Sequence, residues 1–111
     1  MKIYLLTAIS LNGGKVYRTK PMAFGVKEEA LAMLSNRIRF DLHNLSDFNT
    51  GMDMYEQEDF MNNLLKGNYA VLNEYGIMFN KNTLTYTRSF PRRESTYELC
   101  IEEVSLTYKL K

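Results

Sequence analysis

The sequence of 111 residues predicts an α+β protein in which two helices pack on one face of an antiparallel β-sheet. Apolar residues alternate with polar ones near both ends of the chain, which is the period of a half-buried strand. In the middle of the chain they recur every three or four residues, which is the period of an amphipathic helix. The expected order is therefore β-β-α-α-β-β-β-β, and a chain of this length forms one domain over residues 1–111.

The clearest pattern lies in the last seventeen residues and predicts a long final strand from Ser95 to Leu110. Apolar residues occupy odd positions up to Ile101 and even positions from Val104 onward, so the phase slips once, at Glu102-Glu103. A slip of one residue would turn every later side chain to the wrong face. A β-bulge absorbs one extra residue with a local bend, and we therefore expect a bulge at this point.

The first strand is expected from Lys2 to Ser10, and Asn12-Gly13-Gly14 predicts a tight turn because these residues tolerate positive φ. The chain then returns from Val16 to Phe24 as a second strand. Pro21 lacks an N–H donor, so this second strand is expected to be bulged or to lie at a sheet edge.

Two helices are expected next, over Lys27–Asn44 and Asp53–Lys66. In the second, Asp53 and Glu56 have capping-box spacing, and Gly67 supplies a residue that readily adopts the left-handed stop conformation. The first helix presents one apolar stripe, made by Leu31, Leu34, Ile38, Leu42 and Leu45.

The rest of the chain has the pattern of strands. Short strands are expected over 69–73 and 76–80, followed by a turn at Lys81-Asn82. The next strand ends at Pro91 and alternates threonine and serine with a second set of side chains. That set shares the opposite face and consists of Leu84, Tyr86, Arg88 and Phe90.

The composition is that of a soluble globular protein, with 45% hydrophobic and 24% charged residues. The single Cys100 cannot form an internal disulfide, and no apolar run approaches the length needed to span a membrane. We therefore expect a cytoplasmic protein that is not associated with a membrane.

The net charge of +1 conceals separate blocks of each sign. The first 27 residues hold five Lys or Arg and no acid, whereas residues 40–65 hold six acids and no Lys or Arg. Residues 80–93 hold four basic residues and no acid. Blocks of this kind can form faces of opposite sign that steer partners, although they can also neutralise one another in the fold.

No catalytic, metal or cofactor motif is found in the sequence. The only histidine, His43, lies near the end of the first helix, where a cation favours the helix dipole. Asp47, Asn49 and Glu58 match three positions of an EF-hand calcium loop, but Met52 stands where that loop requires glycine. We accordingly expect a protein that is not an enzyme and holds neither a metal nor a cofactor.

The leading hypothesis is a small interaction protein that binds and modulates or inhibits a protein or nucleoprotein partner. One version is a phage or mobile-element inhibitor of a host enzyme or defence complex, by analogy of class alone. The start of the chain, with Phe24-Gly25-Val26 before Glu28-Glu29-Ala30, looks like that of many small bacterial and phage proteins. The acidic block would imitate nucleic-acid charge with Asp47, Asp53, Glu56, Glu58 and Asp59.

The alternative is a nucleic-acid-binding protein that uses the basic and aromatic segment from Tyr86 to Arg93. Aromatic side chains would stack on bases while arginines contact phosphates. The residues involved would be Tyr86, Arg88, Phe90, Arg92 and Arg93. The arginines would equally suit an acidic protein partner. A homodimer through an edge strand is a further possibility, provided that the last strand lies at the edge of the sheet.

Overall fold

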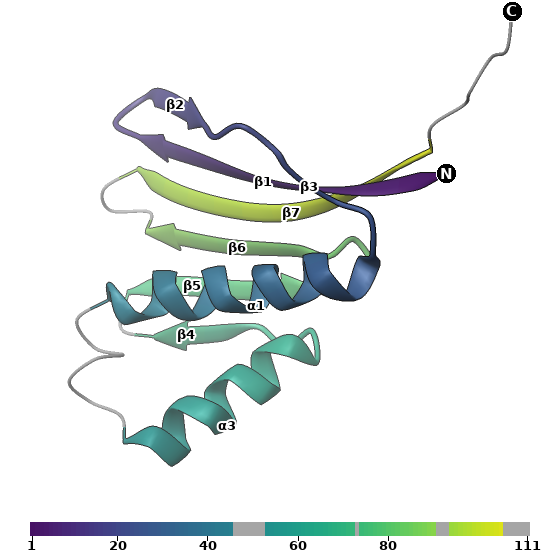
Figure 1. The fold of residues 1–111 in the computed structure, drawn as a ribbon. Coiled ribbons are helices and arrows are strands. Elements are labelled where there is room, and N and C mark those ends of the chain that lie inside the picture. Colours follow the sequence, from purple (N-terminus) through teal and green to yellow (C-terminus); the bar gives the residue numbers. More distant parts are fainter. Residues whose placement is uncertain (46–52, 73, 91–93, 106–111) are drawn as a thin grey trace, which may run out of the picture.

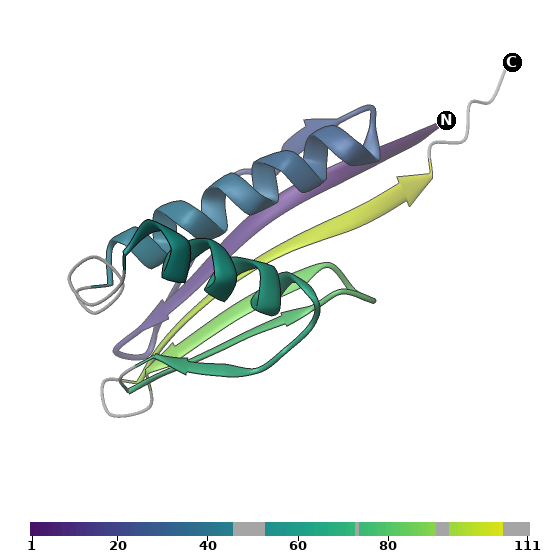
Figure 2. The same cartoon turned by 90° about the horizontal axis from the view of Figure 1, so that it is seen from below.

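The structure, a computed structural model, describes residues 1–45, 53–72, 74–90 and 94–105. Within them it shows a seven-stranded antiparallel sheet with two helices on one face, which confirms the predicted fold class (Figures 1 and 2). The elements are β1 (Lys2–Asn12), β2 (Lys15–Arg18), β3 (Met22–Phe24), α1 (Lys27–His43), α3 (Met54–Leu65), β4 (Ala70–Leu72), β5 (Tyr75–Asn80), β6 (Thr85–Phe90) and β7 (Ser95–Ser105).

The predicted second strand is divided into two short strands that both pair with the same edge of β1. β2 pairs with residues 9–12 of β1, and β3 pairs with residues 4–6. Between them the Thr19 amide donates to the Ala8 carbonyl at 2.9 Å, and the Ala8 amide donates to Thr19 Oγ1 at 3.1 Å. Thr19 thus completes the edge of β1 just before Pro21, whose ring nitrogen could not donate.

The last described strand, β7, lies inside the sheet, in the order β2-β1-β7-β6-β5-β4. It pairs with β1 along its whole length, from Lys2 opposite Ser105 to Asn12 opposite Ser95. The long C-terminal strand is therefore confirmed as far as Ser105, and residues 106–110 of the prediction lie outside the described residues. A homodimer through an exposed edge of this strand is contradicted over residues 95–100, because β1 and β6 pair with both sides there.

The predicted bulge at Glu102-Glu103 is wrong, because the register between β7 and β1 continues through both residues without an extra one. The change of pattern has another cause. The pairing with β6 ends at Cys100, so later residues of β7 run past the beginning of β6. Position 103 is exposed at this end of the sheet, and Glu103 pairs there with Lys2 at 3.1 Å. Val104 instead lies on the opposite face, beside Ile3.

The core forms where the two helices meet the sheet. The stripe of α1 is buried as predicted at Leu34, Ile38 and Leu42, each at most 1% exposed. The Asp53 carboxylate caps α3 by accepting from the Glu56 amide at 2.8 Å, and Gly67 takes a φ of 86° after the helix. The sheet supplies the opposing residues of the core, which are Leu6, Ile77, Phe79, Tyr86, Leu99 and Ile101.

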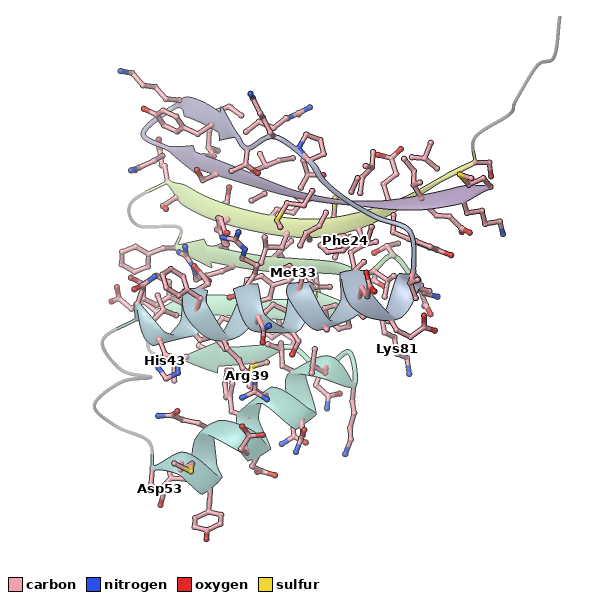
Figure 3. The ribbon with its side chains drawn as sticks, viewed as in Figure 1. Phe24, Met33, Arg39, His43, Asp53 and Lys81 are labelled. Atoms are coloured by element: carbon pink, nitrogen blue, oxygen red, sulfur yellow. The ribbon has the colours of Figure 1, made fainter. Side chains whose placement is uncertain are left out.

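The two helices are also joined at their surface. Arg39 extends from α1 toward α3 (Figure 3) and binds the Glu58 carboxylate through two hydrogen bonds of 2.7 and 3.3 Å. These bonds lower the pKa of Glu58. Neither described helix is long and apolar enough to cross a membrane.

Candidate functional site

The most polar part of the interior is an ion pair between α1 and β6. The Asp41 carboxylate is only 8% exposed because it follows Ile38 by one helical turn and so faces the sheet. Arg88 donates to it twice, from Nε at 2.8 Å and from Nη2 at 3.1 Å. The buried Tyr86 hydroxyl donates to the same carboxylate at 2.6 Å. Both carboxylate oxygens are thus occupied by donors from one strand.

Aromatic rings enclose the guanidinium group of this ion pair. Its central carbon lies 5.6 Å from the centroid of the Tyr75 ring and 5.5 Å from that of Tyr97, within cation–π range. Tyr75 in turn stacks on Phe90 with 4.7 Å between ring centroids. Tyr75 and Tyr97, from the strands on either side of β6, therefore flank the charge on the helix side of the sheet.

The electrostatics of this cluster hold its protons in place. Burial and the nearby Asp41 charge raise the pKa of Tyr86 far above its ordinary range. Burial opposes the charge of Arg88, but the hydrogen bonds and charge of Asp41 outweigh this effect and raise the pKa of Arg88. Burial also raises the pKa of Tyr97. A neutral phenol and a permanent ion pair suit a clamp between helix and sheet better than a proton-transfer site.

These positions correct part of the predicted basic and aromatic surface. Tyr86 has no exposed surface and Phe90 is 8% exposed, so neither can stack on a base without unfolding this region. The charge of Arg88 is already neutralised by Asp41. Arg92 and Arg93 lie outside the described residues.

The predicted acidic surface is divided among several roles. Asp53 caps its helix and Glu58 pairs with Arg39, whereas Glu56 and Asp59 are exposed on α3. Asp47 lies outside the described residues. The first turn of α3 also exposes two large side chains, Met54 at 78% and Tyr55 at 87%.

For the calcium loop, Asp47 and Asn49 lie outside the described residues, and Glu58 is engaged by Arg39. Across the described ranges no group of three or more histidine, cysteine or acidic side chains is arranged to hold a metal ion.

A pocket lies on the helix side of the sheet, between α1 and the segment that joins β2 to β3. Its volume is about 130 Å³. Its walls come from four segments: Leu6 and Ala8 of β1, the 19–22 segment, Arg37 of α1, and Tyr97 and Leu99 of β7. Ala8 pairs with Leu99 across the sheet, and its small side chain leaves room that a larger residue would fill.

No helix among the described residues covers the opposite face of the sheet, which forms a second candidate surface that we call the open face (Figure 2). Toward its β4 end, the Tyr69 side chain lies over Gly76, where an added Cβ would come within 2.5 Å of the Tyr69 hydroxyl. Toward its other end most outward residues of β1 and β2 form an apolar strip, which is interrupted by Thr7, is bordered by Arg18 and consists of Ile3, Leu5, Ile9, Leu11 and Val16. Cys100 lies beside this strip, as expected from its alternation with Leu99 and Ile101.

Comparison of the chain with protein-family models, with curated proteins and with solved structures finds no match.

Several of these features escaped the sequence analysis, although signals for two of them are present. Asp41 occupies the same helical stripe as Leu34, Ile38 and Leu45, and a charge within an apolar stripe indicates a buried partner. The first strand is apolar at both odd and even positions, which is typical of strands covered on both faces. The pocket has no such signal, because it depends on how the 19–22 segment passes α1.

Proposed function

We propose that this chain is a binding protein without chemistry of its own, and that a protein partner docks on the apolar strip of the open face. The observation that carries the proposal is the composition of β1. Its helix side holds Tyr4, Leu6 and Ala8, and its open side holds the apolar Ile3, Leu5 and Ile9 together with the polar Thr7.

A half-exposed antiparallel strand ordinarily alternates apolar residues toward the core with polar residues toward water. β1 departs from this pattern, whereas β6, which lies beyond β7 in the sheet, follows it with Thr85, Thr87 and Ser89 on the open face. The open-face residues of β1 are only partly buried, and Val16 of β2 is 63% exposed. An apolar strip of this kind, rimmed by polar residues, is the usual mark of an interaction surface.

The charges beside the strip indicate the chemistry of the partner. Glu98 and Glu102 of β7 lie on the open face next to Ile9 and Leu5, and Arg18 of β2 lies on the other side of Ile9. Phosphate groups would be repelled by these carboxylates, so they disfavour a nucleic acid on this surface. They favour a protein that presents apolar side chains bordered by lysine or arginine. When this chain covers that surface of the partner, it would modulate or inhibit the partner.

The test compares partner capture by three immobilised proteins: the wild type, an Ile9→Thr/Leu11→Thr variant, and a Thr87→Ser control. Threonine retains strand propensity, so the double variant should fold while losing the apolar strip. We expect the wild type and the control to retain the same partner. The affinity of the double variant for this partner should be about tenfold or more lower, since each 1.4 kcal/mol of lost binding free energy lowers affinity tenfold. Equal capture by all three would contradict the proposal.

A second measurement distinguishes a foreign partner from a second copy of the chain. Light scattering after size exclusion should give the monomer mass for the wild type and for the double variant. A wild-type dimer that dissociates on Ile9→Thr/Leu11→Thr would show that the open face pairs with itself, and the proposed foreign partner would then be wrong.

A further inference from the structure

We infer that the pocket between α1 and the 19–22 segment binds a carboxylate that carries a short apolar group, such as the C-terminal leucine of a peptide. The pocket lies on the helix side of the sheet, so this inference goes beyond the proposed docking on the open face and does not rest on it.

The inner wall of the pocket is apolar. Leu6 and Leu99 are 3% and 1% exposed and belong to the core, and Ala8 lies between them on the same face of the sheet. Met22 of β3 packs against the same core and completes the apolar lining. An apolar ligand group in this position would remove surface from water on all these sides.

Both charged residues at the pocket are cations. Arg37 and Lys20 line it together with the neutral Thr19 and Tyr97, and no acidic side chain is among the lining residues. Arg37 is close enough to Tyr97 for its charge to act on the Tyr97 phenol. A ligand that entered the pocket would therefore meet positive charge at its polar end.

These two cations have no carboxylate partner within the described part of the chain. The ion pairs there involve Lys2, Arg39 and Arg88 instead. Arg37 Nη2 donates to the Met22 thioether sulfur at 3.7 Å, and a thioether is a weak acceptor. A carboxylate would be a much stronger acceptor for the same donor, because charge-assisted hydrogen bonds are roughly twice as strong as neutral ones.

The volume limits the size of the apolar group. Cavities of about 150 Å³ lined by aliphatic side chains hold benzene. The pocket volume of about 130 Å³ is slightly smaller and therefore suits one leucine side chain.

The experiment titrates the ¹⁵N-labelled protein with N-acetyl-leucine and, separately, with its neutral amide, and follows backbone amide shifts. We expect saturable shifts at Ala8, Thr19 and Leu99 with the acid. The amide should bind about tenfold more weakly, the factor that corresponds to 1.4 kcal/mol. Binding of the acid should weaken as salt is added, because the cations are exposed.

Substitutions in the pocket, with one matched control outside it, test whether the shifts come from binding there. Arg37→Gln and Lys20→Gln should each weaken the acid and leave the amide unchanged, whereas the matched Lys15→Gln removes the same charge outside the pocket and should have little effect. Ala8→Leu should fill the pocket and abolish binding of both ligands, with Ala8→Val as the smaller change if leucine impairs folding. Circular dichroism melts would establish that each variant is folded.

Any of three results would overturn the inference. The first is the absence of localised, saturable shifts with N-acetyl-leucine. The second is equal binding of acid and amide, since the cations would then contribute nothing. The third is binding that Lys15→Gln weakens as much as Arg37→Gln, since the attraction would then come from general charge. None of these results bears on capture of a partner by the open face, so the two proposals fail separately.

Discussion

The two faces of the sheet are built from the same strands but differ in what covers them. On the helix face, Ile77, Tyr86 and Leu99 are at most 1% exposed, and even an ion pair is buried. On the open face, the apolar residues of β1 are only partly buried, and no helix of the described part of the chain lies over them. The difference teaches that apolar content alone does not separate a stabilising surface from a binding surface, because β1 supplies both.

The largest expected effect lies on the helix face, in the ion pair between Asp41 and Arg88. Arg88→Met would leave the Asp41 carboxylate buried without its cation, and we expect a loss of about 3–5 kcal/mol in the free energy of unfolding. Urea denaturation followed by circular dichroism measures this loss. The double variant Asp41→Leu/Arg88→Met removes both charges and should recover much of it. A single variant as stable as the wild type would show that the pair does not clamp α1 to the sheet.

The next effect compares matched truncations on the two faces. Leu99→Ala removes a fully buried side chain and should cost about 2–5 kcal/mol of unfolding free energy. Ile9→Ala removes a similar side chain from the open face and should cost about 1 kcal/mol or less of unfolding free energy. The Ile9 side chain is only partly buried, so its removal loses less buried apolar surface. Urea midpoints of the two variants provide the comparison. Equal losses would mean that the open face is covered in solution, for instance by self-association.

The smallest effect is a change in stability with alkaline pH. The pKa of Tyr86 is raised in the folded state, so its contribution is complete below the ordinary tyrosine pKa of about 10 and is lost as pH rises above it. The slope from this residue should approach about 1.4 kcal/mol per pH unit. Tyr86→Phe should flatten the slope between pH 10 and 11, whereas Tyr17→Phe, at a 57% exposed position, should not. Identical slopes in all three proteins would indicate that Tyr86 ionises freely.

The periodicity of apolar residues and the residues typical of turns and helix ends made most of the fold predictable. The stripe of α1, the Asp53 cap, the Gly67 stop and the alternation of β6 depend on neighbours within a few residues, and all of these are present in the structure. The bulge was mispredicted because the apolar pattern of β7 reflects where β6 begins, which is a property of the assembled sheet. Local patterns cannot report the length of a strand's neighbour.

The candidate sites were less predictable for the same reason. The segment from Tyr86 to Phe90 was correctly expected to place its aromatic and arginine side chains on one face. The sequence analysis did not predict that the helices cover this same face. Because they do, residues expected to contact a partner are buried in the core. The pocket is lined by Ala8, Arg37 and Tyr97 from three separate elements, and their spacing along the chain does not predict that they lie close together.

The pairing of β1 with β7 has a consequence for how the chain folds. β1 is the first strand and β7 the last one described, so the longest ladder of the sheet joins residues from opposite ends of the described chain. Loop closure over such distances is slow, and topologies rich in long-range contacts fold slowly. During synthesis, until β7 is made, β1 has an unpaired edge and apolar residues on both faces. A partly folded chain of this kind is prone to aggregation. We therefore expect the yield of folded protein to depend on how quickly the ribosome delivers β7.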